Sequence, residues 1–357
     1  MRPPARNSLA GEALRKTLKT AISMPEGLVE RVFGEPPRND RGAALDHQLH
    51  ALLQILETVG APKPEELGAV EAREVYRRSN RLFDLDPVEL YGVEERTIPG
   101  PAVPIPIRVY RPTPEADSAL VFFHGGGYVI GSLDGYDGLC RRLSEATGRV
   151  VISVDYRLAP EDPFPAAVDD TVAAYRWVVD EAEQLGIISD NIAVGGDSAG
   201  GNLATVTCQK QHVDGRPQPS RQLLLYPATD ETQSYPSAQH FSEGYLLTES
   251  MMKWFIDCYL GDADRHDWRV SPILFDSLGE LAPATVITAG FDPLRDEGEA
   301  YAAKLEAAGV DVTLRCYEQL IHGFVTMGGV IDAAQQAIDE IAADFERTKS
   351  ESATSAI

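Results

Sequence analysis

Long apolar runs are absent from this 357-residue sequence, and their absence limits where the protein can reside. No uncharged apolar stretch reaches about 18 residues, the length that a membrane-spanning helix needs. The basic N-terminal residues Arg2, Arg6, Arg15, Lys16 and Lys19 are not followed by the apolar stretch of a secretory signal. We therefore expect a cytoplasmic protein without a membrane span.

Basic residues are scarce relative to acidic ones. The chain has 32 lysines and arginines against 55 aspartates and glutamates, so its formal net charge is -23. Charge of this sign repels phosphate backbones, which argues against nucleic acid as a partner. The acidity itself indicates a solvated surface and says nothing about chemistry.

Cysteines are few and widely spaced. The four, Cys140, Cys208, Cys258 and Cys316, show neither the paired spacing of a zinc site nor that of a redox pair. We expect reduced, mostly buried thiols and no metal.

The texture of the sequence divides the chain into a helical beginning and a longer mixed part. Residues 1–90 have apolar residues at helical spacing, for example Leu49, Leu52, Leu53 and Leu56, and they predict an N-terminal helical cap segment. Residues 91–357 form the predicted catalytic domain. Near 230–275 the pattern is aromatic-rich and lacks a strand, which indicates an insertion that completes the cap.

Short apolar segments alternate with helical patterns from about residue 93 onward. This alternation predicts an α/β fold with a mostly parallel eight-stranded sheet flanked by helices. The predicted strands are Val93–Ile98, Ile105–Tyr110, Ala119–Phe123, Val150–Val154, Ile192–Val194, Leu223–Tyr226, Thr285–Ala289 and Val312–Tyr317.

A Gly-Asp-Ser-Ala-Gly motif at 196–200 lies between a predicted strand and a predicted helix. That context is typical of a nucleophile elbow, in which a tight turn presents a serine hydroxyl at the carboxyl edge of a sheet. Gly196 and Gly200 would remove side chains that the turn brings too close together. The motif therefore predicts Ser198 as nucleophile, although five residues alone are a weak signal.

A second glycine-rich motif, His124-Gly125-Gly126-Gly127, directly follows the predicted strand 119–123. Acyl transfer creates an oxyanion that needs preorganised backbone N–H donors, and bare glycine backbone can approach it closely. We assign this role to Gly126 and Gly127 with Ala199. His124 is expected to hold the loop and not to act as a base.

A serine nucleophile needs a neutral histidine to accept its proton and a carboxylate to orient that histidine. His322 follows the last predicted strand, and Asp292 follows the strand before it. The resulting chain order of serine, acid and histidine is typical of α/β-hydrolases. Asp296 is the competing acid but fits a first-turn helix carboxylate better, and Asp197 is interpreted as structural.

Together these motifs resemble the GDSAG branch of the hormone-sensitive lipase family, the bacterial family IV carboxylesterases of the α/β-hydrolase superfamily. The resemblance extends over roughly residues 95–345 and includes 155–161, 196–201, 292–297 and 322–324. It implies a serine carboxylesterase that hydrolyses short- to medium-chain or aryl esters without metal or cofactor. It further implies a small-molecule ester as partner and a homodimer formed through the last strand, Val312–Tyr317.

Two alternatives stay open from the sequence. The same triad could serve an amidase or a deacetylase, and gibberellin-receptor-like proteins of this fold bind a small molecule without catalysis; the retained His322 argues against the second. Tyr128, Phe241 and Tyr245, with Trp254, are candidate substrate-binding aromatics, although aromatic residues are also common in ordinary cores.

Overall fold

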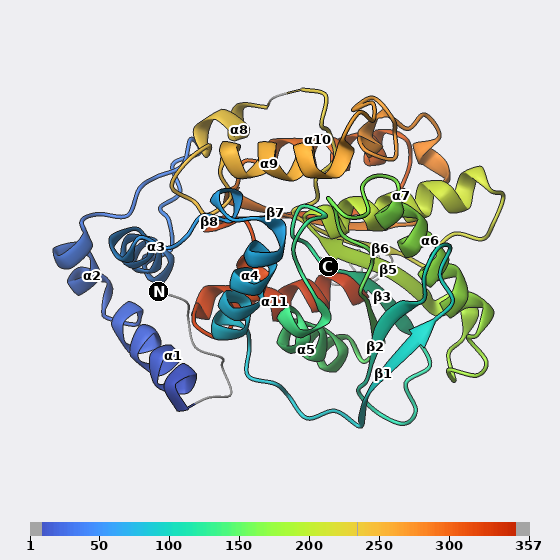
Figure 1. Ribbon diagram of the computed structural model, residues 1–357, viewed down its shortest axis with the longest axis horizontal. Coiled ribbons are helices and arrows are strands. Elements are labelled where there is room, and N and C mark those ends of the chain that lie inside the picture. Colours follow the sequence, from blue (N-terminus) through green and yellow to red (C-terminus); the bar gives the residue numbers. More distant parts are fainter. Residues whose placement is uncertain (1–8, 234, 348–357) are drawn as a thin grey trace, which may run out of the picture.

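The structure, a computed structural model, describes residues 9–233 and 235–347. The basic residues Arg2 and Arg6 lie outside these ranges. The described chain contains one eight-stranded sheet with the strand order β1-β2-β4-β3-β5-β6-β7-β8 (Figure 1). Strands β1 and β2, and β2 and β4, pair antiparallel, and all other neighbours pair parallel.

The eight predicted strands are confirmed, with small differences in their limits. They are β1 (Gly92–Ile98), β2 (Ile105–Arg111), β3 (Ala119–Phe123), β4 (Val150–Val154), β5 (Ile192–Asp197), β6 (Gln222–Leu225), β7 (Ala284–Phe291) and β8 (Val312–Ile321). Strands β7 and β8 run further than predicted because Phe291 and Ile321 still pair after an irregularity that follows Ala289. This extension carries both strands up to the loops that hold Asp292 and His322.

Helices cover both faces of the sheet, as the alternating pattern predicted. They are α5 (Asp137–Thr147), α6 (Ala166–Asp180), α7 (Ala199–Val213), α10 (Arg295–Ala307) and α11 (Asp332–Glu346). Helices α5 and α11 belong to the hydrophobic cluster on one face, and α6, α7 and α10 belong to the cluster on the other.

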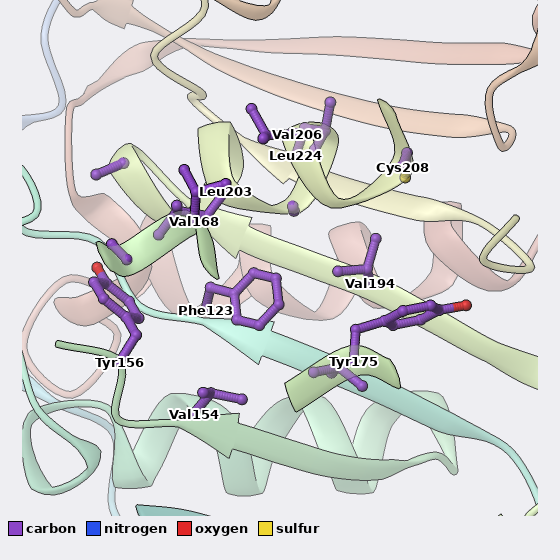
Figure 2. Packing of buried hydrophobic residues seen from close by; sticks show 14 of the residues in the cluster. Phe123, Val154, Tyr156, Val168, Tyr175, Val194, Leu203, Val206, Cys208 and Leu224 are labelled. Atoms are coloured by element: carbon purple, nitrogen blue, oxygen red, sulfur yellow. The ribbon is translucent and has the colours of Figure 1, made fainter. Parts of the chain in front are cut away.

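Strands β2 to β8 each contribute side chains to both hydrophobic clusters because successive residues point to opposite faces. In β3, Val121 and Phe123 belong to one cluster, whereas Leu120 and Phe122 belong to the other. Figure 2 shows Phe123 surrounded by aliphatic and aromatic side chains from neighbouring strands and helices. A strand that is buried on both faces reads as a continuous apolar run, which explains why the central strands could be predicted.

Between residue 9 and the first strand there are four α-helices: α1 (Leu9–Ile22), α2 (Glu26–Phe33), α3 (His47–Val59) and α4 (Ala69–Phe83). Figure 1 shows them in blue, gathered to one side of the sheet. Helix α3 has well-defined ends. Asp46 accepts hydrogen bonds from the amides of Gln48 and Leu49, and Gly60 ends the helix in the left-handed conformation.

The described residues of the segment 230–275 form two α-helices, α8 (Pro236–His240) and α9 (Glu249–Leu260), and no strand of the sheet. This segment meets the N-terminal helical segment where the Ser250 hydroxyl donates a hydrogen bond of 2.7 Å to Glu65. Among the described residues, no helix combines the length and the apolar character that crossing a membrane requires.

Candidate active site

Ser198 lies at the turn between β5 and α7. Its backbone dihedrals are φ 55° and ψ -120°, a conformation that non-glycine residues adopt only where the surroundings impose it. The Ser198 amide donates to the carbonyl of Leu225 on β6 at 2.8 Å. A Cβ on Gly196 would collide with Gly200, and one on Gly200 would collide with the carbonyl of Phe123, so both glycines are required for this turn. This is the geometry of a nucleophile elbow.

Strand register places the acid and the histidine side by side. Phe291 at the end of β7 pairs with Ile321 at the end of β8, and the next residues are Asp292 and His322. Asp292 is fully buried, and its Oδ1 accepts a hydrogen bond of 2.8 Å from the amide of Leu294. One carboxylate oxygen is therefore held by the loop of Asp292 itself, and the other is left for the histidine.

The imidazole of His322 bridges the other two residues. Its Nδ1 lies 2.8 Å from Asp292 Oδ2, and its Nε2 lies 3.0 Å from Ser198 Oγ. An ionised carboxylate can only accept, so Nδ1 carries the proton and Nε2 presents its lone pair to the serine hydroxyl. The structure thus brings together the three residues that the sequence singled out.

The competing acid, Asp296, is engaged elsewhere. It lies in the first turn of α10, where its carboxylate accepts from the Ser237 amide at 2.9 Å and from Arg295 Nε at 2.8 Å. No contact with His322 is found for it among residues 9–233 and 235–347.

The glycine loop supplies free backbone donors next to Ser198. Gly126, Gly127 and Ala199 line the same cavity as Ser198. Within the part of the chain that is described, their N–H groups have no hydrogen-bond acceptor. Gly127 has φ 59°, and a Cβ there would collide with the Phe255 ring, so glycine is needed at this position.

His124 lies beneath this loop, away from the serine. Its side chain is fully buried, its Nδ1 is 2.8 Å from the carbonyl oxygen of Gly125, and its ring stacks on Tyr156 with centroids 4.4 Å apart. Burial lowers the pKa of this imidazole, so the ring is neutral. These contacts fit a loop-holding residue.

Asp197 joins the nucleophile turn to the glycine loop. Its Oδ1 accepts from the Gly125 amide at 2.7 Å, and its Oδ2 accepts from the Tyr136 hydroxyl at 3.1 Å. Burial raises the pKa of this carboxyl to about 6. The Tyr136 hydroxyl is in turn 3.2 Å from that of Tyr76 on α4. Sequence motifs did not point to these tyrosines, because neither residue belongs to one.

A cavity of about 870 Å³ opens over Ser198 and His322. One face of α4 lines it, through Val75, Tyr76, Ser79, Asn80 and Phe83. Their spacing repeats every three or four residues, so helical periodicity could have identified this face. Residues of the 230–275 segment also line the cavity.

The structure changes the expected set of cavity aromatics. Tyr128 lines the cavity as predicted, whereas Phe241, Tyr245 and Trp254 are not among the described residues that line it. Phe241 is buried instead between Tyr245 and Phe291, with ring centroids 5.5 and 5.6 Å away. Phe255, which follows Trp254 in α9, lines the cavity in its place.

Comparison with known proteins gives consistent results. The profile of the alpha/beta hydrolase fold family matches residues 120–326. The carboxylic ester hydrolase LipN of Mycobacterium tuberculosis is 47% identical over 267 residues, 71% of each chain. The ethyl acetate hydrolase of Pseudomonas putida is 40% identical over 308 residues, 83% of this chain and 96% of that protein.

Solved structures show the same likeness. An ester hydrolase from the metagenome of Lake Arreo, complexed with a bipyridine phosphonate derivative, is 41% identical and superposes with a TM-score of 0.82, covering 85% of this chain and 98% of that one. A hyperthermophilic esterase from Pyrobaculum calidifontis, also 41% identical, gives a TM-score of 0.78 over 83% and 96% of the two chains. The chain therefore belongs to the α/β-hydrolase family, in the hormone-sensitive lipase branch that its motifs predicted.

Proposed function

We propose that Ser198, His322 and Asp292 hydrolyse carboxylic esters through a covalent acyl-enzyme. The observation that carries this proposal is the single imidazole bridging the buried carboxylate and the serine hydroxyl, at 2.8 and 3.0 Å. In this arrangement the imidazole can take the proton of the serine hydroxyl while the carboxylate orients the imidazole, which is what activation of a serine nucleophile requires.

In the first half-reaction, Ser198 Oγ attacks the ester carbonyl while His322 Nε2 takes its proton. The amides of Gly126, Gly127 and Ala199 stabilise the oxyanion. The tetrahedral intermediate then expels the alcohol, which receives the proton from the imidazolium. In the second half-reaction, His322 deprotonates a water that attacks the acyl-enzyme, and Ser198 leaves with the proton. Asp292 stabilises the imidazolium in both halves.

The chain is a carboxylic ester hydrolase, the activity named for its relatives at 40–47% identity. Short- to medium-chain or aryl esters suit a cavity of about 870 Å³, which falls within the usual size range of small-molecule sites. Amide hydrolysis is the second candidate, because the same triad can perform it once the amine is protonated.

We assign residues 1–90 and the insertion at 230–275 to the cap, because α4 and the loop and helix segments of the insertion line the cavity. We also propose a cytoplasmic homodimer. Strand β8 is an edge strand of the sheet, and its Leu314 is 46% exposed, so a second β8 could pair with it.

The test compares the wild-type protein with Ser198→Ala on p-nitrophenyl acetate and p-nitrophenyl butyrate. We expect the variant to lose hydrolysis while it keeps the wild-type thermal unfolding temperature. Wild-type activity in a folded variant would reject Ser198 as nucleophile. The same enzyme assayed on matched p-nitroanilides measures its preference for esters over amides.

A further inference from the structure

Acidic side chains outnumber basic ones in the lining of the cavity over Ser198. Within the described chain, five carboxyl groups line it against two permanently charged cations. The carboxyl groups belong to Asp197, Asp230, Glu231, Glu249 and Glu297, and the cations to Lys253 and Arg265. A concave site lined mainly by one sign of charge concentrates ligands of the opposite sign.

Three of these carboxyl groups accept hydrogen bonds from other groups of the protein. Asp197 holds the glycine loop as described above. Asp230 accepts from the amide and the hydroxyl of Thr232, at 2.9 and 2.5 Å. Glu297 accepts from the amides of Thr229 and Asp230, at 2.7 and 3.3 Å. Glu249 is exposed at the cavity rim, in the first turn of α9.

Glu231 differs from the other four. Its backbone is fixed, since its amide donates to Ser271 Oγ at 3.0 Å and its carbonyl accepts from Arg265 Nη1 at 3.4 Å. The carboxylate itself has no hydrogen-bond donor and no ion-pair partner among the described residues. Arg265 thus contacts the main chain of Glu231 and leaves its carboxylate free to meet a substrate.

The surroundings of Glu231 disfavour its charge. Burial raises the pKa of the Glu231 carboxyl to about 7, Arg265 opposes this shift, and Asp230 adds to it. Burial is the largest cause of the raised pKa values of Glu297 and Tyr128, and the charge of Glu231 raises both further. A cation bound beside Glu231 would relieve this unfavourable burial of negative charge.

Aromatic rings lie on the walls of the same cavity. Tyr76, Phe83, Tyr128 and Phe255 all line it. The face of an aromatic ring attracts a cation, and a carboxylate together with such faces is the chemistry that binds quaternary ammonium groups. A primary ammonium would instead seek several hydrogen-bond acceptors for its three N–H donors.

We propose that Glu231 is a specificity residue that recognises a quaternary ammonium group on the ester substrate. The inference rests on the proposed esterase function and adds a substrate class to it. The protein then prefers an ester with a trimethylammonium substituent over its uncharged carbon isostere, with Glu231 supplying the charge and the aromatic walls contacting the methyl groups.

The test uses pairs of esters that differ only in charge. On the alcohol side, choline butyrate is compared with 3,3-dimethylbutyl butyrate. On the acyl side, the p-nitrophenyl ester of 4-(trimethylammonio)butyrate is compared with that of 5,5-dimethylhexanoate. Quaternary groups are chosen because a free amine in the same molecule would attack the ester carbonyl and cleave the ester without the enzyme. For at least one pair, we expect kcat/KM of the wild-type protein to be about tenfold higher for the cationic member.

The Glu231→Gln variant removes the charge and keeps the shape of the side chain. We expect its cationic-to-neutral ratio to fall to within about twofold of unity. Glu243→Gln is the matched control, since it removes the same charge from an exposed residue of the 230–275 segment that is not among the described residues lining the cavity, and we expect it to keep the wild-type ratio. Thermal unfolding of each variant verifies that it is folded.

The wild-type ratio provides a second readout that needs no variant. It should rise between pH 6 and pH 8 as Glu231 ionises, and any effect of pH that is common to both esters cancels in the ratio. A wild-type ratio near one for both pairs would overturn the inference, as would an equal loss for both esters in Glu231→Gln. If no neutral ester were hydrolysed, the proposed function would fail, and the inference with it.

Discussion

The catalytic edge of the sheet and the cavity above it are built by different means. At the edge, the parallel strands β5, β6, β7 and β8 pair in this order through their main chains, so the residues that follow β5, β7 and β8 lie at the same edge of the sheet. In the cavity, the wall comes from α4 and from the insertion at 230–275, whose side chains converge from far apart in the chain. The edge is thus specified by backbone register, and the cavity by side-chain packing.

This difference predicts how each region responds to substitution. A change at the edge removes a group that acts on the reacting atoms, so it should lower kcat by orders of magnitude. A change in the cavity wall alters how the substrate sits, and its effect should depend on which ester is offered.

The largest effect is expected for His322→Ala. The variant lacks the proton acceptor that lies 3.0 Å from Ser198 Oγ, and kcat for p-nitrophenyl butyrate should fall by about 10⁴-fold or more. Stopped assays over hours would measure the residual rate. A fall of less than about tenfold would mean that another group accepts the proton.

The next prediction separates the two aspartates. Asp292→Asn should lower kcat by about 10³- to 10⁴-fold, because an amide facing Nδ1 favours the wrong tautomer of His322. Asp296→Asn should cost less than about tenfold, since Asp296 binds Ser237 and Arg295 and not the imidazole. Equal losses in the two variants would contradict the assignment of the acid.

Asp197 links the nucleophile turn to the glycine loop, and the pH dependence of the stability of Asp197→Asn tests this link. The folded state raises the pKa of Asp197 to about 6 from 3.8, so the unfolded chain loses this proton first and wild-type stability falls as pH rises from about 4 to 6. The asparagine variant lacks this loss. Its stability relative to wild type should therefore rise across that window, by at most about 3 kcal/mol.

Differences in unfolding temperature between the two proteins, measured from pH 4 to pH 7, report this directly. A constant difference would show that Asp197 does not titrate in the window. A difference that falls with pH would mean that its ionised form is stabilised by folding.

The smallest effect is expected for Tyr76→Phe, at the boundary of the two regions. The change removes the hydroxyl that lies 3.2 Å from the Tyr136 hydroxyl but keeps the ring in the cavity wall. We expect kcat to change by no more than about threefold. A loss of a hundredfold, found alike for acetate and butyrate esters, would show that α4 helps to position the glycine loop.

The same comparison explains what the sequence could and could not predict. The central strands are continuous apolar runs, so their limits were close to correct, and the loops after them carried Ser198, Asp292 and His322 in an order that the fold requires. The glycines at 126 and 127 were likewise visible, because few residues tolerate such a loop. The expected lengths of β7 and β8 were too short, since pairing resumes beyond the irregularity at Ala289.

The cavity could not be predicted in this way. Phe241 and Phe255 are both aromatic and both lie in the insertion, yet only Phe255 lines the cavity, because the direction of each side chain depends on how α8 and α9 pack. The free carboxylate of Glu231 gave no signal at all, since a single glutamate in an acidic chain has no distinguishing pattern. The environment of Glu231 depends on contacts made in the folded chain, such as the hydrogen bond from Arg265 to its carbonyl.

The central claim is that Ser198 is the nucleophile, and covalent labelling tests it most directly. The protein is treated with diethyl p-nitrophenyl phosphate, digested and analysed by mass spectrometry, with Ser198→Ala as the control. We expect one diethylphosphoryl group per chain on Ser198, appearing in parallel with the loss of esterase activity, and none on the variant. Inactivation with the label on another residue, or equal labelling of the variant, would contradict it.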